Sequence, residues 1–164
     1  IIFYNLLLMI SVTLMGGLGN QLFQIVAVLG YAFRYNTGYT FPRGKQKGDP
    51  RVKMYWNNLL DKIVGSISPK PIRFPVYNEQ EFKYNEIRHF NKPHKLFGYF
   101  QSYKYFEDQY EKIYTLLGLD EKKNKIRDKF GPFDNTISLH FRIGDYKCKH
   151  VKEYHPILDT IYFS

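Results

Sequence analysis

Cysteine is almost absent from the sequence. The single Cys148 excludes an internal disulfide and any cysteine-rich zinc site, and a free thiol favours a reducing compartment. Long apolar runs are missing as well: the uncharged stretch at residues 1–15 is shorter than the ~20 apolar residues that span a bilayer, and it has no basic start. We therefore expect a cytoplasmic protein that can associate with membranes, or a Golgi-type membrane protein if an anchor precedes residue 1.

Internal repeats and low-complexity segments are also missing. Hydrophobic residues make up 44% of the chain and charged residues 24%, which excludes a disordered tail. With 164 residues the chain can bury one sizeable core, but it is small for an enzyme that closes two domains over a substrate. We expect one domain, either complete or cut from a larger protein.

The chain is basic, with a formal net charge of +9. Lysine and arginine neutralise phosphates, so this charge is compatible with nucleic-acid binding. The basic residues are nevertheless scattered among acidic ones, as in DEKKNKIRDK at residues 120–129. A solvated basic surface is the simpler interpretation.

The N-terminal region predicts a strand, a glycine turn and a helix. Met9 is a natural start, which makes residues 1–8 upstream translation or the remnant of an anchor. Residues 10–15 are apolar and β-branched, as in a strand buried on both faces of a parallel sheet. Glycines follow, and NTG at 36–38 offers a C-cap. Apolar residues recur between them at helical spacing: Leu22, Ile25, Val26, Leu29 and Phe33.

Further elements alternate along the chain. The patterns predict strands at 39–42, 94–100 and 135–141, helices at 55–64, 102–117 and 120–130, and an extended connection at 66–75. Ser102 is the expected cap of its helix. Strands that alternate with helices indicate parallel βαβ units and an α/β fold.

The segment GGLGNQ follows the first predicted strand, where open α/β sheets bind ligands. Leu22 stands where a dinucleotide loop has its third glycine, and the Walker lysine is missing, so the sequence gives only weak support to dinucleotide binding or NTP hydrolysis. Glycine still lets the backbone approach a phosphate closely, and Asn20 can cap the helix and donate a hydrogen bond. The alternative is a tight turn that needs a positive φ.

The segment SLHFRIGDY places polar residues at and after the last predicted strand. Arg142 offers a planar fork that suits a phosphate, with His140 and Asp145 beside it. The alternatives are an Arg142–Asp145 ion pair that closes the turn and a core histidine. Asp145 and His140 are both candidates for a catalytic base.

Three segments together resemble a known family. In this order, GGLGNQLFQ at 16–24, GYFQSYKYF at 98–106 and ISLHFRIGDY at 137–146 resemble the alpha-1,2-fucosyltransferases of glycosyltransferase family 11. EYHPILDTIYF at 153–163 looks like the helix that follows the family's arginine motif. The resemblance covers residues 10–163, and residues 43–70 carry no family motif.

The resemblance implies a two-domain GT-B enzyme that transfers a sugar, usually fucose from GDP-fucose, to a glycan hydroxyl. The transfer inverts the anomeric centre and needs no metal or other cofactor. Residues 9–134 then form the Rossmann-like N-terminal domain, and residues 135–164 begin the nucleotide-sugar-binding domain, most of which is missing. We therefore expect negligible turnover from these 164 residues alone.

The resemblance also implies roles for single residues. The family's first motif arginine, which binds the β-phosphate of the donor, falls on Arg142, whereas its second arginine falls on Ile143. The chain has no Asp-x-Asp pair to hold a metal, and an arginine can stabilise the leaving diphosphate instead. The residues that match the loop facing the donor and the acceptor are Gly17, Leu18, Gly19, Asn20 and Gln21.

Two other functions remain as alternatives. A basic binding module for RNA or an acidic polysaccharide would use the charge and the 18% of aromatic residues. It would need aromatic and basic side chains on one sheet face, whereas most Tyr and Phe here fall at core spacings. An inactive fragment is the third possibility. Our expectation is an enzyme whose partners are a GDP-sugar and a glycan, with no nucleic acid.

Overall fold

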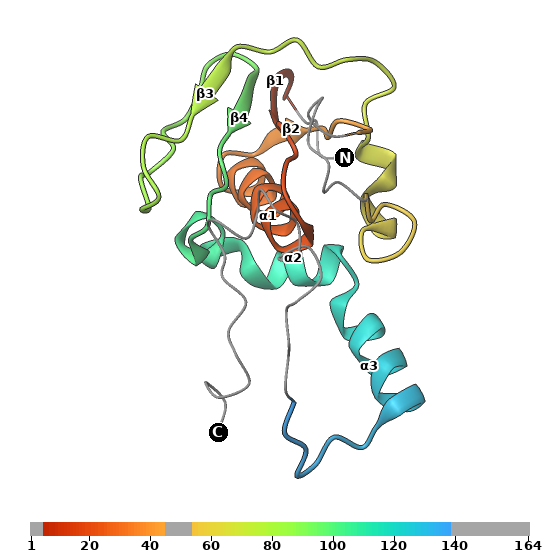
Figure 1. The fold of residues 1–164 in the computed structure, drawn as a ribbon. Helices are drawn as coiled ribbons and strands as arrows, with labels where there is room; N and C mark the ends of the chain where they lie inside the picture. The colour runs from red at the N-terminus through yellow and green to blue at the C-terminus, as the bar shows by residue number, and fades with distance from the viewer. Residues whose placement is uncertain (1–4, 45–53, 139–164) are drawn as a thin grey trace, which may run out of the picture. The chain divides into compact units, whose positions relative to one another are not determined.

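The computed structural model describes residues 5–44 and 54–138 (Figure 1). The chain divides into two compact units, Ile1–Ile126 and Arg127–Ser164. The predicted domain boundary between residues 134 and 135 therefore falls inside the second unit. The sheet, its covering helices and two of the three family-like segments belong to the first unit.

A four-stranded parallel sheet organises the first unit (Figure 1). In this sheet Ile10, on the central strand β1, lies opposite Tyr39 on one side and His94 on the other. The predicted α/β class with parallel strands is thus confirmed. In sheet order the strands are β2 (Thr37–Tyr39), β1 (Asn5–Val12), β4 (His94–Phe97) and β3 (Val76–Asn78).

Strand β1 is buried as the sequence predicts, but its bounds differ. Ile10, Ser11 and Val12 are at most 1% exposed, so both faces of the strand are covered. The strand runs from Asn5 instead of residue 10, because Asn5 already pairs with Thr37 of β2. It ends at Val12 instead of residue 15, although the Thr13 N–H still donates a 2.9 Å hydrogen bond to the Leu96 carbonyl of β4. Residues 5–8 are therefore part of the central strand.

Helix α1 (Leu18–Arg34) follows the glycine turn as predicted. Ile25, Val28 and Leu29 are fully buried and form part of its core-facing side. The helix ends just before the predicted cap, and Asn36, with φ of +49°, takes the left-handed conformation there. Gly38 of the same NTG sequence already lies in β2.

The region 102–117 does not form the one continuous helix that its pattern predicts. It is divided into η2 (Tyr103–Tyr105), η3 (Glu107–Gln109) and α2 (Tyr110–Leu116). The break falls at Phe106, whose φ is −141°. At this point the backbone passes Gly30 of α1 so closely that an added Cβ would lie 2.5 Å from the Tyr105 carbonyl oxygen. Ser102 precedes η2 but makes no side-chain capping bond.

The other predicted helices and strands agree only partly with the structure. The helix predicted at 55–64 is a 3-10 helix, η1 (Asp61–Ser66), whereas α3 (Leu119–Phe130) nearly matches its predicted bounds. The strand predicted at 39–42 is shifted to β2, and Phe41 forms a single bridge with Ile67. Residues 135–138 form no strand, and residues 139–141 lie outside the described residues.

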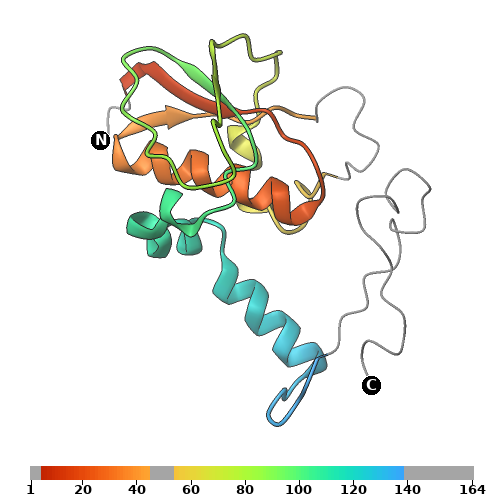
Figure 2. The same ribbon diagram turned by 60° about the vertical axis from the view of Figure 1, so that its left-hand side comes forward.

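Helix α1 lies between the sheet and the segment 103–116, as both views show (Figures 1 and 2). Its buried side chains meet Ile10, Val12 and Leu96 of the two central strands in one hydrophobic core. This packing fixes the first turn of α1 near the carboxyl ends of β1 and β4. The core therefore places the glycine segment (16–21) beside the GYFQ segment (98–101), although Asn20 and Gln101 are 81 residues apart in the sequence.

Candidate functional site

The glycine loop after β1 contains glycines in two different situations. Gly16 has a φ of +75°, and a Cβ added to it would lie 2.4 Å from Asn20 Nδ2, so the turn itself requires this glycine. A Cβ added to Gly17 or Gly19 meets no described atom within 4 Å. A purely structural turn thus accounts for Gly16, and Gly17 stands at the N-cap of α1, where glycine is favoured, but Gly19 remains unexplained. A closely approaching ligand is a reason to keep Gly19 bare.

Asn20 does not have the capping role that the sequence predicts. The N-cap of α1 is Gly17, which makes no side-chain capping bond, and Asn20 is the third residue of the helix. The capping prediction is wrong because Leu18 and Gly19 already have helical geometry. Instead, the Asn20 Oδ1 atom accepts a 2.7 Å hydrogen bond from Gln101 Nε2.

A buried glutamine, Gln24, forms hydrogen bonds with both the loop after β1 and the GYFQ segment. Gln24 is completely buried; its Oε1 accepts a hydrogen bond from the Met15 N–H, and its Nε2 donates to the Gly98 carbonyl, both at 3.1 Å. Met15 belongs to the loop after β1, and Gly98 follows β4. One side chain therefore satisfies a backbone donor and a backbone acceptor from two neighbouring strand ends.

Gln21 has a supporting position in this arrangement. It is completely buried, and its Nε2 donates a 3.0 Å hydrogen bond to the Gly16 carbonyl. This bond holds Gly16, the residue with a positive φ in the glycine loop, against α1. Leu18, Gly19 and Asn20 lie at the start of the helix, where backbone N–H groups have no partner within the helix and attract anions.

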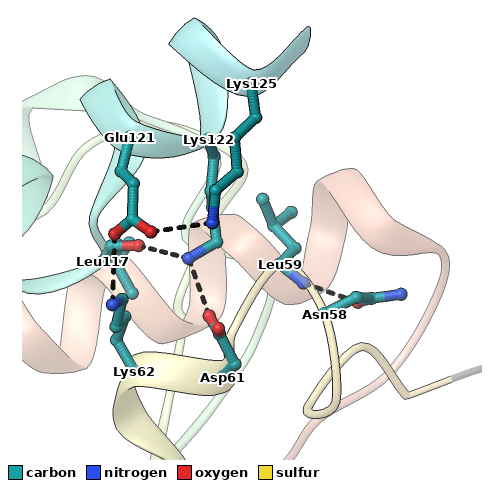
Figure 3. A network of polar contacts seen from close by, with 8 residues as sticks. All are labelled: Asn58, Leu59, Asp61, Lys62, Leu117, Glu121, Lys122 and Lys125. Carbon is teal, nitrogen blue, oxygen red and sulfur yellow. Dashed lines mark hydrogen bonds and ion pairs between the residues drawn. The ribbon is translucent and has the colours of Figure 1, made fainter. Parts of the chain in front are cut away.

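A second feature beside the loop is a depression of about 420 Å³. Leu18, the first residue of α1, lines it together with Tyr55 and Leu59. The charged residues around it are shown in Figure 3 and come from η1 and α3. They are Asp61, Lys62, Glu121, Lys122 and Lys125.

These lysines are engaged in ion pairs (Figure 3). Lys122 donates to Asp61 Oδ1 at 2.7 Å and to the Leu117 carbonyl at 2.9 Å. Glu121 pairs with Lys125 at 2.8 Å and with Lys62 at 3.2 Å. The hydrogen bond from Lys122 lowers the pKa of Asp61, and the bond from Lys125 lowers the pKa of Glu121. The carboxylates of Asp61 and Glu121 offset the positive charge of these lysines, so the depression attracts an anion only weakly, and the glycine loop is the better candidate site.

The structure brings together only part of the predicted site. The segments that contain Asn20 and Gln101 meet at the ends of β1 and β4, whereas Arg142, Asp145 and His140 lie outside the described residues. Residues 5–44 and 54–138 contain no group of three metal-ligating side chains and no helix long and apolar enough to cross a membrane.

Sequence reasoning missed three supporting residues. Gln24 and Gln101 stand inside the family-like segments, so those segments were the available signal for them. Glu79, whose side chain binds the GYFQ segment, lies in a stretch without any motif, and nothing in the sequence marks it.

No model of a known protein family, no curated protein and no solved structure matches the chain.

Proposed function

We propose that this protein is a glycosyltransferase that moves a sugar, L-fucose from GDP-fucose, to a hydroxyl group of a glycan. One observation carries the proposal. Two segments that resemble fucosyltransferase motifs, 16–24 and 98–106, meet at the ends of adjacent parallel strands and are linked by Gln24 and by the Gln101–Asn20 bond. Motif segments far apart in sequence converge in this way when they build one ligand site.

The finer fold assignment belongs to the same proposal. The parallel sheet with α1 after its central strand is compatible with the first domain of a GT-B enzyme. In such an enzyme this edge of the sheet faces the cleft between two domains. The proposed cytoplasmic location, with membrane association, rests on the low cysteine content, because a single cysteine favours a reducing compartment.

The chemistry of the transfer explains the residues at this edge. As the sugar leaves, negative charge develops on the β-phosphate of the nucleotide, and fixed donors there stabilise the transition state. Gly17 and Gly19 leave the start of α1 accessible, so its N–H groups can approach a diphosphate or a sugar hydroxyl. Arg142 would supply the fork that binds the β-phosphate in place of a metal ion, and Asp145 or His140 would accept the proton of the attacking hydroxyl.

Nucleotide binding tests the proposal on the protein expressed from its complete gene. Calorimetry with GDP, UDP and ADP should give measurable affinity for GDP alone, with no loss in EDTA. Transfer of labelled fucose from GDP-fucose to a galactoside should follow. Equal affinities for the three nucleotides, or binding abolished by EDTA, would contradict the proposal. Salt-dependent RNA binding without GDP affinity would instead favour the basic binding module.

Two alanine variants test the glycine loop in the same assays. Gly19→Ala adds a methyl group where no described atom lies within 4 Å, so the fold should be unaffected while a closely bound substrate is displaced. Gly65→Ala is the matched control, because its added Cβ is equally unobstructed but lies in η1. We expect transfer to fall roughly 10-fold or more for Gly19→Ala alone.

A further inference from the structure

Glu79 binds the backbone of the GYFQ segment from a neighbouring strand. It directly follows β3, and its backbone N–H donates to the Phe97 carbonyl at 2.8 Å. The carboxylate then accepts the Tyr99 N–H at 2.7 Å and the Phe100 N–H at 3.0 Å. Since no described lysine, arginine or histidine pairs with it, its partners are backbone amides.

The turn that Glu79 holds has an unfavourable backbone. Phe100 has a φ of +52°, which a bulky residue rarely adopts. A Cβ added to Gly98 would lie 2.3 Å from Glu79 Cβ, so this position accepts only glycine. Such conformations persist when surrounding bonds enforce them. The hydrogen bonds that the Tyr99 and Phe100 N–H groups donate to the Glu79 carboxylate hold the turn in this conformation.

Both links between the strand ends depend on this turn. The Gly98 carbonyl, which accepts the bond from Gln24, lies immediately before the two amides that Glu79 holds. Gln101, which donates to Asn20, lies immediately after them. A change in the turn would therefore move Gln101 away from Asn20.

We propose that Glu79 is a positioning residue for the sugar-transfer site, which it serves by fixing the turn that brings Gln101 to Asn20. This inference rests on the proposed function. Glu79 itself contacts no reacting atom: its carboxylate orients two backbone amides, and the turn orients the Gln101 and Asn20 amides toward the hydroxyl groups of the substrate. Oε2 accepts from both Tyr99 and Phe100, and Oε1 accepts a second bond from Phe100. A carboxylate suits this role because both of its oxygens accept, whereas a glutamine would place an NH2 donor opposite the Phe100 N–H at the Oε1 position.

The test compares Glu79→Gln with Glu81→Gln in the protein from its complete gene. Glu81 is the matched control because Glu81→Gln loses the same charge two residues away, where the carboxylate pairs with the exposed Lys83. NMR of the side-chain amides of Asn20 and Gln101 reports their geometry without any substrate. Initial rates with GDP-fucose and a galactoside, normalised to folded protein, measure the catalytic activity of the site. Glu79→Asp, which keeps both oxygens on a shorter side chain, is measured in the same way should Glu79→Gln not fold.

The expected result is that the Asn20 and Gln101 resonances shift in Glu79→Gln and kcat/KM falls about 10²-fold, while Glu81→Gln matches the wild type. Unchanged resonances overturn the inference, and so does an unchanged kcat/KM despite shifted resonances, which would mean a structural role only. If the wild type transfers no sugar, the proposed function fails and this inference fails with it. If the Asn20 and Gln101 resonances nevertheless shift in Glu79→Gln, the structural link from Glu79 to these side chains is correct and the assigned sugar-transfer function is wrong.

Discussion

Gln24 Nε2 donates a 3.1 Å hydrogen bond to the Gly98 carbonyl, and so one buried side chain joins the ends of β1 and β4 across 74 residues of sequence. Its other amide atom satisfies the Met15 N–H. Both polar atoms of a completely buried amide are thereby paired with backbone groups. The relative position of the two family-like segments depends on this residue.

Replacing Gln24 by leucine should destabilise the protein strongly. Leucine has a similar volume but leaves the Met15 N–H and the Gly98 carbonyl without their partner, and the free energy of unfolding should fall by about 2–4 kcal/mol. Urea denaturation measures this change. Gln80→Leu, at an exposed position, is the control and should lie within about 0.5 kcal/mol of the wild type. A loss of the same size in both variants would show that the bridge is not responsible.

Gly30→Ala should also destabilise the protein, although alanine has a higher helix propensity than glycine. In an unobstructed helix alanine is more stable than glycine by about 1 kcal/mol. At Gly30, however, the added methyl would lie 2.5 Å from the Tyr105 carbonyl oxygen and 2.9 Å from Phe106 Cα, so we expect a net loss of about 1–3 kcal/mol. Thermal and urea unfolding of Gly19→Ala, which meets no described atom, should show no loss. A stabilised Gly30→Ala would contradict the close approach of α1 to η2.

Asp108→Asn should remove a pH-dependent contribution to stability. Arg34 Nε donates to Asp108 Oδ2 at 2.8 Å, and its Nη2 contacts Oδ1. The hydrogen bond from Arg34 holds the pKa of Asp108 below its ordinary value. Because the folded pKa is the lower one, the contribution is complete above the unfolded pKa of about 3.9 and is lost as the pH falls through the folded pKa.

Urea unfolding at several pH values checks this contribution. For a partly exposed pair we expect about 0.2–1 kcal/mol between wild type and Asp108→Asn at pH 7, with the difference disappearing in acid. The neighbouring exposed Glu107→Gln is the control and should show no such difference. A gap of the same size at every pH would mean that asparagine disturbs the packing of η3 itself.

Arg142→Lys should strongly reduce the rate of sugar transfer by the protein expressed from its complete gene. Lysine keeps the charge but replaces a planar fork by a single flexible donor, so two aligned hydrogen bonds to the β-phosphate become one. By analogy with the removal of one oxyanion donor, kcat should fall about 10²–10³-fold while the melting temperature stays unchanged. Near-normal kcat with a lower melting temperature would instead assign Arg142 to an ion pair with Asp145.

The sequence was sufficient for the elements whose signal is local. The apolar run before Gly16 predicts the buried strand, and the 3.6-residue spacing from Leu22 to Phe33 predicts α1, because burial on one side repeats with the period of the element itself. The charged helix at 120–130 buries no side chain, and its local signal is instead a run of good helix formers such as Glu, Lys and Arg. The family-like segments at 16–24 and 98–106 also marked where the candidate site would form.

Tertiary structure decided the features whose cause lies elsewhere in the chain. β3 has only three residues, Val76–Asn78, and no apolar alternation, so it is a strand only because β4 provides its hydrogen-bonding partner. The helix predicted from Ser102 is broken at Phe106 because the backbone there passes close to Gly30. In the sequence nothing distinguishes Glu79 from other glutamates; only the folded structure shows that it binds the backbone of the turn at Tyr99. Each of these depends on a contact between distant residues, and no local pattern contains both partners.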